Sequence, residues 1–123
     1  MQSEPTSEQI LSARPEELVM MLFQGAARFG REAIAHLDDD RDDLAAESIH
    51  RVRAILAELD RTIDHEAGPL GRHLAAIYEY LMRRISAPVV ERADVVGVVS
   101  DIEEIGAAWE ALVEQRSSEL QSA

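Results

Sequence analysis

One metal-ligand spacing stands out in the sequence, the Glu-x-x-His step formed by Glu47 and His50. Helical bundles can hold two iron ions with two such steps and two further glutamates, all projecting into the bundle. No second Glu-x-x-His step is present. At about 100° per residue, Glu47 and His50 also lie more than about 120° from the apolar stripe of their own helix. We therefore interpret both as exposed side chains, and we expect no metal and no cofactor.

The acidic run at residues 38–43 has the composition of a calcium-binding loop but not its pattern. An EF-hand loop has glycine at its sixth position and a bidentate glutamate at its twelfth. Counting from Asp38, these positions hold Asp43 and Ile49. The run is therefore interpreted as a solvated loop between two helices, in which the like charges repel one another.

An exposed histidine on a short helical bundle also permits phosphotransfer. The segment from His50 to Ala54 loosely resembles the His-x-x-Lys-Gly motif of histidine phosphotransfer domains, but Arg53 and Ala54 replace the lysine and the glycine. A phosphotransfer module with His50 as the phosphoacceptor stays open as the alternative function. Hydrolase, P-loop and dinucleotide-binding signatures are absent from the sequence, so we expect a protein without enzymatic activity.

Composition narrows the class of protein. The chain has 123 residues, of which 46% are apolar, and this favours one domain around one core. Twenty-four acidic residues and twelve arginines give a net charge of −12, which argues against nucleic acid or an anionic membrane as a partner. Cysteine is absent, so neither disulfides nor thiolate metal sites are available. Without a secretory signal or a membrane-spanning apolar run, a cytoplasmic location is expected.

The apolar residues recur with helical period in four segments. Breaks at residues 38–43, at Gly68-Pro69 and at Pro88 separate the segments, and Asp94 is the expected N-cap of the last one. The sequence predicts an all-α fold, an antiparallel four-helix bundle over residues 14–116. Residues 1–13 are expected to form a flexible arm and residues 117–123 a frayed tail. The predicted core stripes of the last three helices are Ala45, Ile49, Val52, Leu56, Leu59 and Ile63, then Leu70, Leu74, Ile77, Tyr78, Leu81 and Ile85, then Val95, Val98, Val99, Ile102, Ile105, Trp109, Leu112 and Val113.

The first predicted helix, over residues 15–37, is more apolar than a core-facing helix requires. Its apolar arc spans roughly 180°, whereas an ordinary stripe needs about 100°. Met20 and Met21 lie at the edge of this arc, and methionine adapts to varied partner shapes. The helix is therefore either central in the bundle or shared between the core and a partner helix.

Four collinear segments resemble the FliS family of flagellar export chaperones. The first joins residues 13–18 to Met-Leu-Phe-Gln-Gly-Ala at residues 21–26, and the second runs from Ile55 to Gly68. The third is Ile-Tyr-Glu-Tyr-Leu-Met-Arg-Arg-Ile at residues 77–85, and the fourth is Ala108-Trp109. The resemblance covers about residues 10 to 113 in the order of the family.

The resemblance implies a bundle without enzymatic activity that binds the disordered C-terminal segment of flagellin. It also implies delivery of that client to the cytosolic domain of the flagellar export gate, and we expect a monomer or weak homodimer. Ile10 and Leu11 would cover the client groove in the free protein, while Tyr78 and Trp109 would anchor the core. The residues expected to contact the client are Met20, Phe23, Ala27, Ile34, Tyr80, Met82, Ile85 and Val89.

Overall fold

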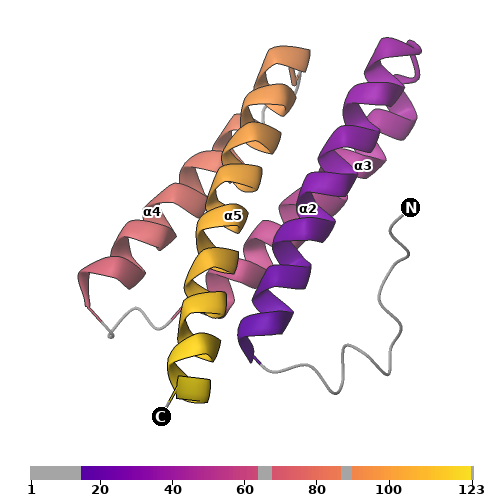
Figure 1. Cartoon of the computed structure of the whole chain (residues 1–123). Helices are drawn as coiled ribbons and strands as arrows, with labels where there is room; N and C mark the ends of the chain where they lie inside the picture. Colours follow the sequence, from indigo (N-terminus) through magenta and orange to yellow (C-terminus); the bar gives the residue numbers. More distant parts are fainter. Residues whose placement is uncertain (1–14, 64–67, 87–89, 123) are drawn as a thin grey trace.

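The computed structural model describes residues 15–63, 68–86 and 90–122, and it arranges them as four helices without a strand. The helices are α2 (Pro15–Asp38), α3 (Asp42–Arg61), α4 (Pro69–Arg84) and α5 (Arg92–Ser122). Consecutive helices run in opposite directions (Figure 1). The predicted all-α antiparallel four-helix bundle is thereby confirmed. The expected arm at residues 1–13 lies outside the described residues.

Local sequence signals set most of the helix ends. Pro15 is the first residue of α2, and Glu16 and Glu17 place negative charge in its first turn, where the helix dipole favours it. Between α2 and α3, Asp40 adopts a φ of 57°, a left-handed conformation that aspartate tolerates. Gly68 precedes α4 with a φ of 118°, which requires glycine, and Pro69 then begins the helix.

The core lies where α2 contacts both α3 and α5 along most of its length. The helix α4 packs mainly against α3 and has a smaller interface with α5. On α2 the most buried face centres on Phe23, Ala26 and Ala33, while Leu22 and Phe29 are only half-buried. The predicted stripes of the other helices supply most of the remaining core, with Leu56, Leu59, Leu81, Ile85, Val98 and Ile102 almost fully buried.

The last helix differs from its prediction at both ends. It begins at Arg92, before the expected N-cap Asp94, whose carboxylate instead accepts a hydrogen bond of 3.4 Å from Arg84. At the other end α5 continues to Ser122 rather than fraying after Arg116. Leu112 was predicted to face the core, but it is 51% exposed. At about 100° per residue, Leu112 lies about 80° from the buried Ile102, at the edge of the apolar stripe of α5 rather than at its centre.

No helix within the described ranges is long and apolar enough to cross a membrane.

Candidate functional site

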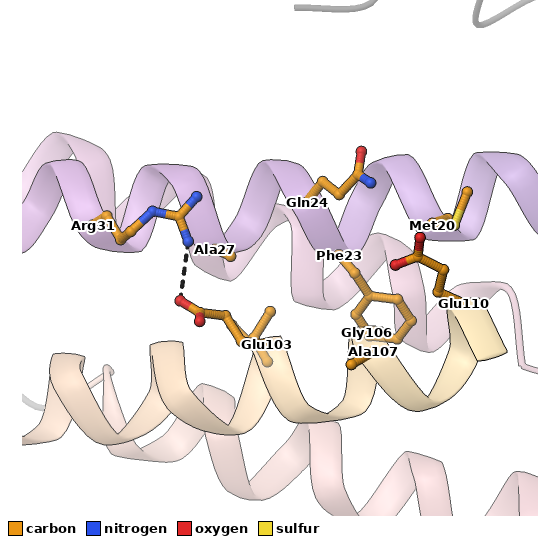
Figure 2. Close-up of a pocket in the computed structure, with 10 residues that line it drawn as sticks. Met20, Phe23, Gln24, Ala27, Arg31, Glu103, Gly106, Ala107 and Glu110 are labelled. Carbon is orange, nitrogen blue, oxygen red and sulfur yellow. Dashed lines mark hydrogen bonds and ion pairs between the residues drawn. The ribbon is translucent and has the colours of Figure 1, made fainter. Parts of the chain in front are cut away.

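A groove on the surface between α2 and α5 is the candidate site (Figure 2). Its cavity volume is about 210 Å³, less than the roughly 300–1,000 Å³ of pockets that enclose a drug-sized ligand. The groove therefore suits one or two side chains of a macromolecular partner better than a whole small molecule. The residues that line this α2–α5 groove are Met20, Phe23, Gln24, Ala27, Arg31, Ile102, Glu103, Gly106, Ala107 and Glu110.

The floor of the groove is apolar, and small residues on α5 keep it open. Phe23, Ala27 and Ile102 are at most 5% exposed and belong to the core. The ring of Phe23 points toward α5 at Gly106 and Ala107 (Figure 2). A Cβ atom at position 106 would lie 3.2 Å from the Cβ of Phe23, a tight contact, so glycine lets the two helices approach closely here.

The two ends of the groove differ in charge. At one end the guanidinium of Arg31 on α2 lies 3.0 Å from the carboxylate of Glu103 on α5 (Figure 2). Both side chains are about half exposed. At the other end Met20 of α2 lies near Glu110 of α5, and no basic group among the described residues pairs with Glu110. One end is therefore neutralised, while the other carries a negative charge.

Contacts outside the groove hold its walls in place. The indole nitrogen of Trp109 donates a hydrogen bond of 3.0 Å to the backbone oxygen of Glu16, which ties the first turn of α2 to α5. The ring of Phe23 lies 6.3 Å from that of Tyr78 on α4, at an interplanar angle of 46°. Tyr78 is 3% exposed, as expected for a core anchor, and Trp109 is half-buried against the core. The walls are thus fixed by the bundle before any partner binds.

The structure divides the residues that the sequence assigned to client binding. Met20, Phe23 and Ala27 line the α2–α5 groove together. Ile34 packs half-buried against the core on another part of α2. Ile85 is 2% exposed and does not line this groove, so its side chain is part of the core.

The remaining assigned residues do not line this groove. Tyr80 of α4 is 49% exposed, and the guanidinium carbon of Arg84 lies 5.9 Å from the centre of its ring. Met82 is half-buried against the core. Val89, Ile10 and Leu11 lie outside the described residues. The described residues of α4 assigned to the client do not line the α2–α5 groove, and their role in client binding stays a prediction.

Sequence reasoning missed the α5 wall of the groove altogether. Its signal is the run Gly106-Ala107-Ala108, three small residues within the apolar part of a long helix. Such a run removes side-chain volume from one stretch of a helix surface and leaves room for a neighbour. The polar rim residues Gln24, Arg31 and Glu110 were also missed, because the sequence around each one does not distinguish it from any other exposed polar residue.

The candidates for metal and phosphoryl chemistry are dispersed. Glu47 and His50 are both exposed on α3, as expected. Within the described parts of the chain, no group of three or more histidine, aspartate or glutamate side chains could hold a metal ion. Next to His50, the guanidinium carbon of Arg51 lies 5.3 Å from the ring centre of Phe29, so this arginine covers the α2–α3 surface.

Comparison with known proteins identifies the family of this bundle. The sequence model of the FliS family, described as "Flagellar protein FliS", matches residues 1–116. A relative from Bacillus subtilis (strain 168), named "Flagellar secretion chaperone FliS", is 27% identical over 108 residues, which cover 84% of this chain and 78% of the relative. The family match extends over all four helices and the whole of the α2–α5 groove. The chain therefore belongs to the FliS family of flagellar proteins.

Proposed function

We propose that this protein is a cytoplasmic flagellar export chaperone without enzymatic activity. Its client is the C-terminal segment of flagellin, which it keeps from polymerising prematurely and delivers to the cytosolic domain of the export gate. Membership of the FliS family and the name of the Bacillus relative, a secretion chaperone, support this function. The protein acts as a monomer or weak homodimer, since a high negative charge opposes self-association.

The α2–α5 groove is the observation that carries the proposal. It combines an apolar floor with a polar rim, the composition that an amphipathic helix requires of its docking site. Its volume admits the apolar anchor of one helical turn. A client that orders only on binding loses conformational entropy at that step, which keeps the complex reversible and lets the chaperone release its cargo.

The decisive variant fills the groove without touching the core. Ala107 lines the groove and is exposed, so Ala107→Leu adds volume at the docking site and leaves the bundle intact. Ala108 is also exposed on α5 but does not line the groove, which makes Ala108→Leu the matched control. Calorimetry with the C-terminal segment of the cognate flagellin should show roughly ten-fold weaker binding for Ala107→Leu, the loss typical of a blocked anchor pocket. Equal affinity of the two leucine variants would contradict docking in this groove.

Phe23 is a less suitable position for this test. Because Phe23 is 3% exposed and packs against Tyr78, Phe23→Asp would bury an unpaired charge and unfold the bundle. A loss of binding would then report on the fold rather than on the groove. His50→Ala is a useful second control, since His50 is exposed on α3 and does not line the groove, and it should bind the segment as the unaltered protein does.

A further inference from the structure

The charge asymmetry of the α2–α5 groove indicates which client helices it accepts. Glu103, Ala107 and Glu110 follow the i, i+4, i+7 spacing and therefore line one edge of α5. From Glu103 to Glu110 this edge is seven residues, or about 10 Å at about 1.5 Å per residue, which is two helical turns. An apolar anchor beside Ala107 thus lies about one turn from each charged end.

The antiparallel packing of α2 and α5 places different residues opposite the two glutamates. Arg31 lies opposite Glu103 and pairs with it at 3.0 Å. The residue of α2 near Glu110 is Met20, which carries no charge (Figure 2). Further along α5, Glu114 does not line the groove, and the guanidinium of Arg116 is 3.5 Å from the carboxylate of Glu16. Of the two carboxylates that line the groove, Glu103 is therefore paired within the bundle, whereas Glu110 is left to face a partner.

We propose that the α2–α5 groove selects a client helix that places a lysine or arginine against Glu110, three or four residues from the apolar side chain buried beside Ala107. This inference rests on the proposed docking of a client helix in the groove. Residues three or four apart share one face of a helix, so the anchor and the basic side chain can enter together. An acidic residue at the same client position would face Glu110 as a like charge, and the groove would reject it.

The test measures binding of the C-terminal segment of the cognate flagellin to Glu110→Gln and Glu110→Arg, with Glu114→Gln as the matched control. Glu114 is also an exposed glutamate of α5 but does not line the groove. We expect about three-fold weaker binding for Glu110→Gln and about ten-fold for Glu110→Arg, the range of an exposed ion pair and of its reversal. Glu114→Gln should bind normally, and the differences should shrink at high salt.

A series of peptides, in which each lysine or arginine of the segment is replaced by glutamine, then locates the partner of Glu110. One replacement should weaken binding to the unaltered protein but have no further effect on Glu110→Gln, which is the signature of a direct pair in a double-mutant cycle. Binding could be weakened by Ala107→Leu and yet be insensitive to Glu110→Gln, to Glu110→Arg and to every peptide replacement. That result would overturn the charge selection but would still support docking of the client in the groove.

Other results separate this inference from the proposed function. A segment that fails to bind the unaltered protein contradicts the function, and with it the charge selection. Equal binding to the Ala107→Leu and Ala108→Leu variants would show that the client docks elsewhere. If a second copy of the chain occupied the groove, the unaltered protein would be a dimer, and Ala107→Leu would be a monomer with unchanged affinity for the peptide. This result too would overturn the inference.

Discussion

Gly30 of α2 lies directly against Val99 of α5, so close that a Cβ atom on the glycine would overlap the Cγ2 methyl group of the valine. Both residues are buried in the interface between the two helices. The valine cannot move away easily, because its β-branched side chain has one preferred rotamer in a helix. The absence of a side chain at position 30 therefore sets how closely α2 and α5 approach beside the groove.

Gly30→Ala should lower the free energy of unfolding by about 1–3 kcal/mol, the usual cost of overpacking a core. Helix propensity alone would have the opposite effect, because alanine is more stable than glycine in a helix by about 1 kcal/mol. A loss of stability would therefore report the overlap with Val99. Urea unfolding followed by circular dichroism measures the effect.

Gly25→Ala is the matched control on the same helix. A Cβ atom there would lie 3.5 Å from Cδ1 of Ile55, an ordinary van der Waals contact. This variant should gain about 0.5–1 kcal/mol from helix propensity. The close approach of α2 and α5 would be refuted if the two alanine variants changed stability in the same direction.

The second prediction concerns alkaline pH. Burial, with a smaller contribution from the charge of Asp60, raises the pKa of Tyr78 from 10.0 to about 12. The unfolded chain ionises this phenol first, so its contribution to stability is complete below pH 10.0 and is lost as the pH rises toward about 12. Thermal unfolding should therefore show a falling midpoint above about pH 10, and Tyr78→Phe should reduce that fall.

Tyr80→Phe is the control for this experiment, because Tyr80 is half-exposed two residues away on α4. Its pH dependence should match that of the unaltered protein. Absorbance near the phenolate band gives an independent check, since in Tyr80→Phe the remaining tyrosine should titrate late. A normal titration of Tyr78 in the folded protein would contradict its burial.

The third prediction concerns the ion pair that joins the end of α2 to the start of α5. The Arg92 guanidinium donates hydrogen bonds of 2.7 and 3.2 Å to the two carboxylate oxygens of Asp38. These bonds hold the pKa of Asp38 below its ordinary value of 3.8. A depressed carboxyl pKa stabilises the fold above the unfolded value, and this contribution is lost as the pH falls through the folded value.

Arg92→Gln should therefore return the pKa of Asp38 toward 3.8, which NMR titration of the side-chain carboxyl carbon can measure. The stability difference from the unaltered protein should be largest at neutral pH and low salt, and it should disappear at acid pH where Asp38 is protonated. Because both groups are exposed, the difference should be small. A difference that persists unchanged in strong acid would show that Arg92 acts through packing instead.

The fold was largely predictable from local sequence signals. Pro15, Gly68 and Pro69 mark helix starts with backbone requirements that hold in any context, and the stripe from Ala45 to Leu59 is buried as its period predicts. The prediction for Leu112 was wrong because this residue lies at the edge of its apolar stripe, where the helical period alone does not decide burial.

The candidate site could be predicted only in part, because a groove belongs to two helices at once. Phe23 and Ile85 are both apolar residues of amphipathic helices, and nothing in their own segments shows which of them borders a groove and which is enclosed in the core. Phe23 borders a groove since Gly106 and Ala107 lie opposite, whereas Ile85 is enclosed in the core. That difference depends on the pairing of α2 with α5, which the period of each helix alone does not specify.

The hydrogen bond from Trp109 to the backbone oxygen of Glu16 gives the last prediction. It fixes the first turn of α2 next to Met20 and Glu110, the negative end of the groove. Trp109→Phe keeps an aromatic ring but removes the donor, so the free energy of unfolding should fall by about 1 kcal/mol, or somewhat more with the lost volume. Amide hydrogen exchange should accelerate at residues 19–22, whose N–H groups bond to the carbonyls of the first turn, because that turn loses its tether while the rest of the helix stays packed. Incorporating benzothienylalanine, which replaces the indole N–H with sulfur and preserves the ring shape, separates the two causes. If residues 19–22 exchanged as slowly in the protein with this analogue as in the protein with tryptophan, the hydrogen bond would not be what positions this end of the groove.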